Sequence, residues 1–189
     1  KGIGYPMFLV LAKKLCLPYS VLLALLQAVG AWLFVRALSV RWKNPYGQTL
    51  LYLLLLFSPI SLTQLVTQRL YRMAIVPGMV LVVFSGMIGL TLRKELPLKK
   101  QLPWAVLTGM ALAFFWQIRE DSVWILPFIA VMTVWNVGYV ILALHKKRTG
   151  RQLLLQCFIL LLPILLLFCD NITISAINQV HYGVFLTND

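Results

Sequence analysis

Long apolar runs alternate with short charged stretches along the whole chain. Most of these runs approach the roughly 20 residues that an α-helix needs to cross a bilayer. Helices satisfy their own backbone hydrogen bonds in lipid, so the pattern predicts an all-α polytopic transmembrane helix bundle. The predicted bundle is a single domain over 1–189, with spans at 18–40, 48–66, 73–92, 102–116, 122–144 and 153–169 and an external polar tail at 170–189.

The beginning of the chain differs from the six predicted spans because its apolar stretch is short. This stretch runs from Tyr5 to Ala12 and is closed by Lys13 and Lys14. Such a length is typical of a helix that lies at the membrane surface or re-enters the bilayer. We therefore predict a short interfacial or re-entrant helix over 1–17, ahead of the first span.

The composition excludes an ordinary soluble domain. Hydrophobic residues make up 61% of the 189 positions and charged residues 12%, whereas soluble domains carry roughly 25% charged residues. The net charge of +12 does not indicate nucleic-acid binding, because the basic residues lie in short loops and form no continuous face. The three cysteines, Cys16, Cys157 and Cys169, lack metal-site spacing.

The loop charges predict an orientation in the membrane. Three loops, 41–47, 93–101 and 145–152, hold the basic residues Arg41, Lys43, Arg93, Lys94, Lys99, Lys100, Lys146, Lys147, Arg148 and Arg151. Positive charge in short loops marks the cytoplasmic side. Of the acidic residues, only Glu95 falls on that side. We predict a multi-pass protein of the plasma (inner) membrane, with both ends and the unusual polar residues on the non-cytoplasmic side.

Three adjacent charges, Arg119, Glu120 and Asp121, occupy the tight connection before the span at 122–144. Ionisable groups are costly in lipid, so these side chains are predicted to lie at the outer membrane edge. Carboxylates beside a guanidinium suit the binding of a phosphate or a divalent metal. The alternative is an ordinary hairpin, although such turns more commonly contain Gly, Asn or Pro.

A row of polar residues leads out of the second predicted span. Gln64, Gln68 and Arg72 are spaced by four residues, which keeps them on one helical face, and Arg69 lies nearby. A row of this kind faces a partner helix or a wet cavity, and arginines on the outer side run against the positive-inside tendency. Gln68, Arg69 and Arg72 are therefore candidates for substrate binding. The alternative is a plain interhelical hydrogen-bond seam.

The predicted polar tail contains His181 and Tyr182. A histidine titrates near neutral pH and can bind a metal or accept a proton. Both residues are therefore candidates for substrate binding on the outer side. The alternative is a plain surface position, since His181 has no recognisable partner in the sequence.

Three short segments are similar to a known family. Residues 1–9, KGIGYPMFL, resemble the K-G-x-G-Y-P-x-F-L stretch of polytopic glycosyltransferases of the C superfamily. Residues 119–127, REDSVWILP, resemble an R-E-[ED]-x-x-W-x-L-P motif of bacterial membrane proteins related to that group. Residues 181–185, HYGVF, are similar to a segment of the same proteins. The chain thus resembles a bacterial branch of this superfamily.

This resemblance implies transfer of a sugar from a polyprenyl-phosphate-linked donor on the external face. Glu120 and Asp121 are then the catalytic candidates, able to bind the acceptor or a metal, and Arg119, Arg69 and Arg72 are candidates for the donor phosphate. In the family, the catalytic base usually comes from the first external loop, ahead of the segment that resembles 1–9. The resemblance therefore implies that the chain is an excerpt lacking the first span and that loop.

Two other functions stay open. A transporter or flippase for an anionic lipid-linked substrate would use the same arginines without making a bond. Transporters commonly contain internal repeats, and we find none in this sequence. A non-catalytic membrane subunit would instead use the charged connection at 119–121 to bind another protein.

Overall fold

The computed structural model describes residues 4–59, 72–118, 120–144, 149–183 and 185, and at 72 and 120–122 it describes the backbone alone. Throughout these residues the chain forms helices joined by short connections, and no strand occurs among them. The elements are α1 (Gly4–Lys14), α2 (Tyr19–Leu38), α3 (Pro45–Leu56), η1 (Arg72–Ile75), α5 (Val76–Leu92), α6 (Leu98–Ile118), η2 (Glu120–Ile125), α7 (Leu126–Leu144) and α8 (Gly150–Tyr182). The all-α prediction is confirmed.

Four helical segments of the described chain are long and apolar enough to cross a membrane. They are Tyr19–Leu38, Met73–Leu92, Val123–Leu144 and Gly150–Tyr182. Each overlaps one of the predicted spans, so the sequence pattern located these four correctly. The predicted count of six spans is not confirmed.

The two remaining predicted spans correspond to a shorter helix and a less apolar one. The prediction at 48–66 overlaps α3, which ends at Leu56, and residues 60–71 lie outside the described part of the chain. The prediction at 102–116 falls within α6, which has 21 residues but begins with Lys99 and Lys100 after its first residue. Length alone would allow α6 to cross a bilayer.

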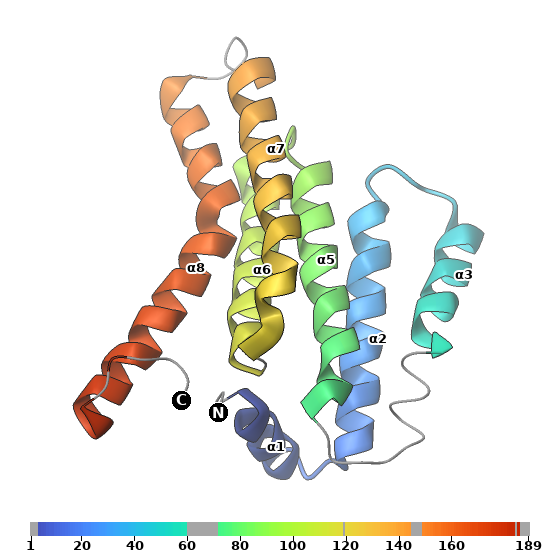
Figure 1. Ribbon diagram of the computed structural model, residues 1–189. Helices are drawn as coiled ribbons and strands as arrows, with labels where there is room; N and C mark the ends of the chain where they lie inside the picture. The colour runs from blue at the N-terminus through green and yellow to red at the C-terminus, as the bar shows by residue number, and fades with distance from the viewer. Residues whose placement is uncertain (1–3, 60–71, 119, 145–148, 184, 186–189) are drawn as a thin grey trace.

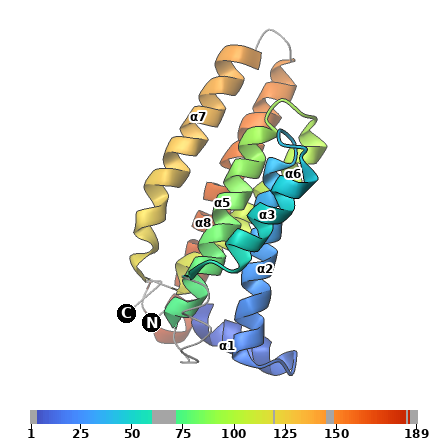
Figure 2. The ribbon, with the colours of Figure 1, turned by 90° about the vertical axis from the view of Figure 1, so that its right-hand side faces the viewer.

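The position of α6 inside the bundle explains its composition. It packs beside α5 and α8 (Figures 1 and 2). Its buried residues include Gln101, Thr108 and Gln117 as well as Leu112 and Phe115. A helix enclosed by other helices contacts little lipid, so its surface does not have to be apolar.

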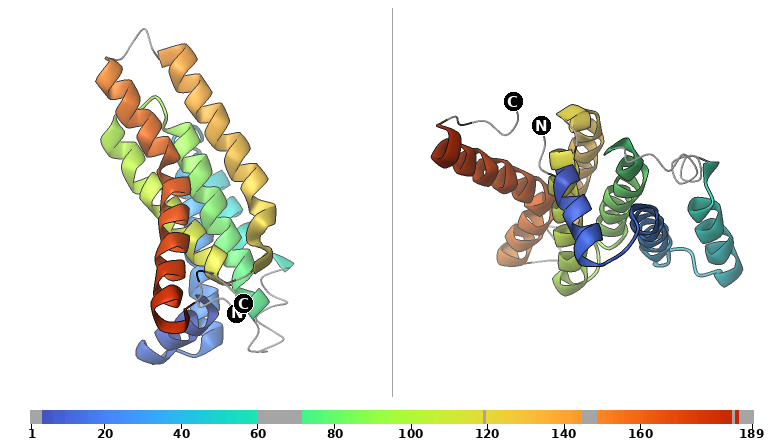
Figure 3. Two further views of the ribbon diagram at one scale, coloured as in Figure 1. Left: turned by 60° about the vertical axis from the view of Figure 1, so that its left-hand side comes forward. Right: turned by 90° about the horizontal axis from the view of Figure 1, so that it is seen from below.

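Consecutive long helices run antiparallel, so the connections alternate between two ends of the bundle (Figure 1). One end, termed the basic end, carries Arg36, Arg41, Lys43, Arg93, Lys94, Lys99, Lys100 and Arg151. The opposite end, termed the α1 end, contains η1, η2 and the last turns of α8. Figure 3 shows α1 lying across this end, beneath the bundle.

Small residues let α5 approach its neighbours closely. A Cβ added to Gly30 of α2 would lie 3.2 Å from the main-chain oxygen of Gly78, and Ser85 Oγ donates a hydrogen bond to the Gly30 oxygen at 3.3 Å. On the side facing α6, Gly89 lies so close to the Trp104 indole that a Cβ would overlap it. Small residues play this role where lipid provides no hydrophobic force between helices.

The longest helix, α8, continues through residues 170–182, which the sequence pattern assigns to the polar tail. Its start is fixed by a capping box between Thr149 and Gln152, and it ends at Gly183, whose φ of 72° is left-handed. Pro163 lies inside the helix, and a proline removes one backbone hydrogen bond. Figure 1 shows α8 bending near its middle, so that its second half leaves the bundle axis.

Replacing Gly89 by alanine is expected to destabilise the bundle, because the new Cβ overlaps Trp104. Overpacking of this kind costs about 1–3 kcal/mol. Gly138 of α7 has open space around it, so Gly138→Ala is a matched control that should be neutral or slightly stabilising. Thermal unfolding of the detergent-solubilised variants measures the difference, and equal melting temperatures would contradict the packing described for α5 and α6.

Candidate functional site

The first turn of α1 packs against the end of α6 at a position where only glycine fits. A Cβ added to Gly4 would lie 2.8 Å from the backbone carbon of Gln117 and 2.8 Å from the backbone nitrogen of Ile118. These backbone atoms cannot rotate aside, so the contact requires a residue without a side chain. One turn later, Phe8 packs edge-on against Tyr19 of α2, with ring centroids 5.9 Å apart. The helix is thereby held against both α6 and α2.

Gln117 links the end of α6 to α8. Its side chain is 4% exposed, and its Nε2 atom donates a hydrogen bond to Asp170 Oδ2 at 2.8 Å. The Oε1 atom of Gln117 is buried and has no hydrogen-bond partner among the described residues. Buried amide oxygens are nearly always paired in folded proteins. This oxygen can therefore accept a hydrogen bond from a ligand or from a water molecule.

The connection from α6 to α7 folds back against the same place. Its backbone forms η2, in which Ile125 is fully buried and Trp124 packs edge-on against Phe115 of α6 with ring centroids 6.2 Å apart. The backbone of Glu120 and Asp121 thus lies at the α1 end, three and four residues after Gln117. We call Gly4, Gln117, Asp170 and the η2 backbone the α1-end cluster.

Several predicted site residues fall outside the described part of the chain. Arg119, Gln68 and Arg69 are among them, and at Arg72, Glu120 and Asp121 the description covers only the backbone. The backbone of Arg72 begins η1, which also lies at the α1 end. The proposed roles of these side chains therefore stay predictions.

His181 and Tyr182 lie in the last turn of α8 and are exposed. Their rings are 6.4 Å apart, centroid to centroid. They follow Asp170 by 11 and 12 residues, which corresponds to about 17 Å along a helix. Figures 1 and 3 show this end of α8 well away from the other helices. The structure therefore does not bring these two residues into the α1-end cluster.

Gln117 and Asp170 were not predicted as site residues, although each carries a signal in the sequence. Gln117 interrupts a largely apolar segment, and Asp170 directly follows the apolar run at 153–169. A polar group next to a membrane span usually has a partner inside the protein. The pairing itself was not predictable, since 53 positions separate the two residues.

A second polar contact lies inside the bundle, between α5 and α7. Asn136 Nδ2 donates a hydrogen bond to Thr91 Oγ1 at 2.8 Å. Asn136 is 1% exposed and Thr133, one turn earlier, is 4% exposed. Asn136 Oδ1 and Thr133 Oγ1 have no partner within the described residues. The interior of the bundle therefore holds polar atoms with unused hydrogen-bonding capacity.

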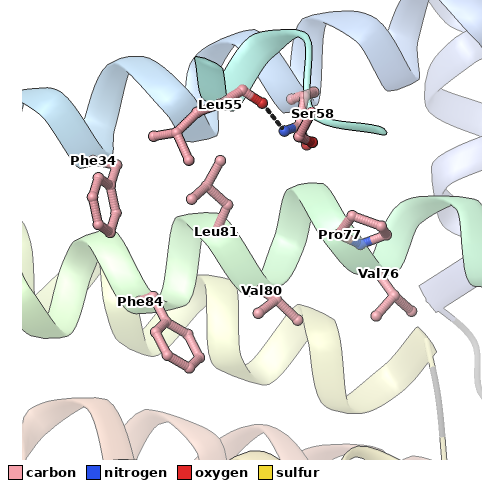
Figure 4. Close-up of a pocket in the computed structure, with 9 residues that line it drawn as sticks. Phe34, Leu55, Ser58, Val76, Pro77, Val80, Leu81 and Phe84 are labelled. Carbon is pink, nitrogen blue, oxygen red and sulfur yellow. Dashed lines mark hydrogen bonds between the residues drawn. The ribbon is translucent and has the colours of Figure 1, made fainter. Parts of the chain in front are cut away.

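A cavity of about 490 Å³ lies between α2, α3 and α5 (Figure 4). Its walls are mainly apolar and include Phe34, Leu81 and Phe84. The Nε2 atom of Gln27, which also lines the cavity, donates a hydrogen bond to the Leu55 oxygen at 2.8 Å, so this donor is already satisfied. A concave site of this size and lining suits a hydrocarbon chain.

Metal binding finds no support in the described residues, because no three His, Cys, Asp or Glu residues are grouped there in a way that could hold an ion. The side chains of Glu120 and Asp121 lie outside the described part of the chain. The sequence-based suggestion of a divalent metal at those two residues stays a prediction.

Comparison of the chain with protein-family models, with curated proteins and with solved structures finds no match in any of the three. The resemblance of residues 1–9, 119–127 and 181–185 to glycosyltransferases of the C superfamily therefore stays a prediction.

Replacing Asp170 by alanine is expected to destabilise the α1 end, because it leaves the buried Gln117 amide without its acceptor. An unsatisfied buried donor costs about 1–3 kcal/mol. Among the described residues, the neighbouring Asn171 bonds within α8, from its Nδ2 atom to the Leu167 oxygen, so Asn171→Ala is the matched control and should change the unfolding free energy by less. Denaturant unfolding in detergent provides the measurement. An equal loss of unfolding free energy in the two variants would mean that the hydrogen bond between α6 and α8 does not stabilise the fold.

Proposed function

We propose that this protein crosses the plasma (inner) membrane six times, with α6 and the segment that begins with α3 as two further spans beside the four long apolar helices. The antiparallel order of the helices supports this proposal. In the proposed topology the basic end is cytoplasmic because basic loops favour that side. α1 then lies at the external surface, and the α1-end cluster faces outward.

The proposed topology predicts that α6 begins inside and ends outside. Lys99, in the first turn of α6, and Val123, five residues after its end, are exposed. Each therefore tolerates replacement by cysteine in a chain whose native Cys16, Cys157 and Cys169 are serine. A membrane-impermeant thiol reagent applied to intact cells should label Val123→Cys and leave Lys99→Cys unlabelled. Inverted vesicles should give the opposite result. Labelling of both positions from one side would mean that α6 does not cross the bilayer.

We further propose that the α1-end cluster is the site of a membrane glycosyltransferase that uses a polyprenyl-phosphate-linked sugar. The observation that carries this proposal is the packing of Gly4 on the backbone of Gln117 and Ile118. This contact joins the first resembling segment, 1–9, to the residue pair just before the second, 119–127. The first segment thus lies at the same end of the bundle as the residues that lead into the second, as parts of a single site would.

The proposed reaction moves a glycosyl group from phosphate to a hydroxyl. A carboxylate takes the proton of the acceptor hydroxyl, whose oxygen then bonds to the anomeric carbon of the sugar. By the resemblance this base comes from the first external loop, and Glu120 and Asp121 are proposed to hold the acceptor or a metal beside it. The bond from that carbon to the phosphate oxygen breaks, and its electron pair leaves with the polyprenyl phosphate. Arg119 is the proposed cation that stabilises the departing phosphate. Arg69, Arg72 and Gln68 are proposed to assist in binding the donor head.

The lipid tail of such a donor needs an apolar path within the membrane. The cavity between α2, α3 and α5 supports this requirement, because Val76 and Pro77 line it at the α1 end of α5 and Phe84 lines it two turns deeper. A tail lying there would remain at hydrocarbon depth while its phosphate stayed at the membrane edge. Aliphatic and aromatic walls suit an isoprenoid chain.

In the natural full-length protein, Glu120→Gln and Asp121→Asn are expected to slow consumption of a polyprenyl-phosphate sugar. A carboxylate that positions the acceptor or a metal at the reacting centre should show a loss of about 100-fold when it is neutralised. Lys13→Gln is the control variant, since Lys13 is an exposed charge of α1 outside all three resembling segments. Mass spectrometry of donor and product in proteoliposomes measures turnover. Unchanged turnover in both carboxylate variants would remove these residues from the proposed site.

A transporter for an anionic lipid-linked substrate is the second candidate, and the polar interior between α5 and α7 favours it. Thr133 and Asn136 offer buried oxygens without partners in the described chain, which a substrate passing through the bundle would use. Movement of a fluorescent lipid-linked sugar across liposomes without product formation would support this function. Product formation without movement would exclude it in favour of the enzyme.

A further inference from the structure

A second pocket lies at the basic end, on the opposite end of the bundle from the α1-end cluster. Its volume is about 340 Å³, and it lies between the last turns of α2 and the first turns of α3. The residues that matter for its chemistry are Arg36, Trp32 and Ser39 of α2 and Gln48, Thr49 and Tyr52 of α3. Cation, hydroxyl, amide and aromatic groups thus converge on one hollow.

The pocket contains one charged group, the guanidinium of Arg36. This side chain is exposed and has no carboxylate partner among the described residues. Arg93 and Arg41 lie in the same region, and Glu95 is the one acidic residue of the two connections, 39–44 and 93–97, at this end. The uncompensated positive charge favours an anionic ligand, and a guanidinium binds phosphate with two parallel hydrogen bonds.

Three polar side chains of the pocket donate hydrogen bonds to the main chain. Ser39 Oγ donates to the Arg36 oxygen at 2.9 Å, and Thr49 Oγ1 donates to the Pro45 oxygen at 3.0 Å. Gln48 Nε2 donates to the oxygen of Trp42. Their own oxygens remain able to accept hydrogen bonds. The pocket therefore presents a cation beside acceptors, which matches a phosphate that carries neighbouring hydroxyl groups.

The surroundings of the pocket point to a lipid as the source of that phosphate. Trp32 is 56% exposed, and Trp and Tyr side chains such as Trp32 and Tyr52 favour the boundary between hydrocarbon and head groups. On the outer surface of the same helices, Val29, Leu50 and Leu54 are 49%, 60% and 63% exposed. Acyl chains would cover these apolar side chains while the head group entered the pocket.

We propose that this pocket binds the head group of an anionic phospholipid of the phosphatidylglycerol type. The phosphate contacts Arg36, and the glycerol hydroxyls donate to the oxygens of Ser39, Thr49 and Gln48. The acyl chains follow the outer surfaces of α2 and α3. Such a lipid would fix α3 to α2 at the basic end. The proposal concerns a site distinct from the α1-end cluster and does not depend on the proposed enzyme activity.

Lipid binding to the purified full chain in a neutral detergent tests this proposal. Native mass spectrometry would measure the retention of dioleoylphosphatidylglycerol and of the zwitterionic dioleoylphosphatidylcholine. The wild-type chain should retain one phosphatidylglycerol at least about tenfold more tightly than phosphatidylcholine, which corresponds to 1.4 kcal/mol. Arg36→Gln should remove this preference. Arg41→Gln makes the same change of charge at an exposed position outside the pocket and should alter retention by less than about twofold.

A second variant tests the pocket without changing its charge. Thr49→Trp fills the hollow with a larger side chain at an exposed position of α3, where folding should be unaffected, and it should also weaken phosphatidylglycerol retention. The proposal would be overturned if Arg36→Gln and Arg41→Gln lost phosphatidylglycerol equally, or if Thr49→Trp retained it fully. Either result would mean that the lipid is held by general electrostatic attraction to the basic surface. Displacement of the lipid by an equal concentration of glycerol 1-phosphate would overturn the lipid as the source of the phosphate.

Discussion

The packing at the basic end depends on a buried arginine that has no acidic partner in the described structure. Arg93 is 8% exposed, and its guanidinium donates to the main-chain oxygens of Arg36 at 2.9 Å and of Ala37 and Gly89 at 3.2 Å. It also lies 4.3 Å from the ring centre of Trp104. Burial lowers the pKa of Arg93, and the neighbouring charge of Arg36 lowers it further, yet a guanidinium stays protonated under such conditions. One side chain thus satisfies the C-terminal carbonyls of α2 while joining α2, α5 and α6.

The two ends of the bundle are closed by different means. At the basic end, buried Gln101 donates to the oxygen of Leu96 at 2.7 Å, and Gln156 of α8 donates to the oxygen of Lys94. Lys94 also lies with its Nζ atom 3.7 Å from the ring centre of Tyr139 in α7. Side chains from three helices therefore hold the turn between α5 and α6. At the α1 end, the contacts of the described residues include the close approach of Gly4 to α6 and the hydrogen bond from Gln117 to Asp170.

The sequence predicted the features that depend on local pattern. The apolar runs located four helices of spanning length. Features that depend on which helices are neighbours were not predictable. Arg93 looks like any other loop charge in the sequence, and its burial follows only from the nearby end of α2. The composition of α6 is ambiguous for the same reason, because an enclosed helix and a poor membrane span share it.

The same limit applies to the candidate site. The charged run at 119–121 stands out in any reading of the sequence, whereas Gln117 and Asp170 acquire meaning only from their contact across 53 positions. The reverse holds for His181 and Tyr182, which are chemically suggestive in the sequence but lie on an exposed helix end. The chemical type of a side chain therefore identifies candidate site residues in the sequence. Which of the described candidates lie close together depends on how the helices pack.

The length of α8 has a mechanical consequence. An α-helix is stiff over a few turns, so a displacement of its exposed last turn is carried along its axis to Asp170, about 18 Å away. Asp170 is bonded to Gln117, the residue from which the charged connection to α7 departs. The second half of α8 would thus move as one rigid segment about the bend near Pro163. Any molecule that pushed on its tip would transmit force to the α1-end cluster without touching it.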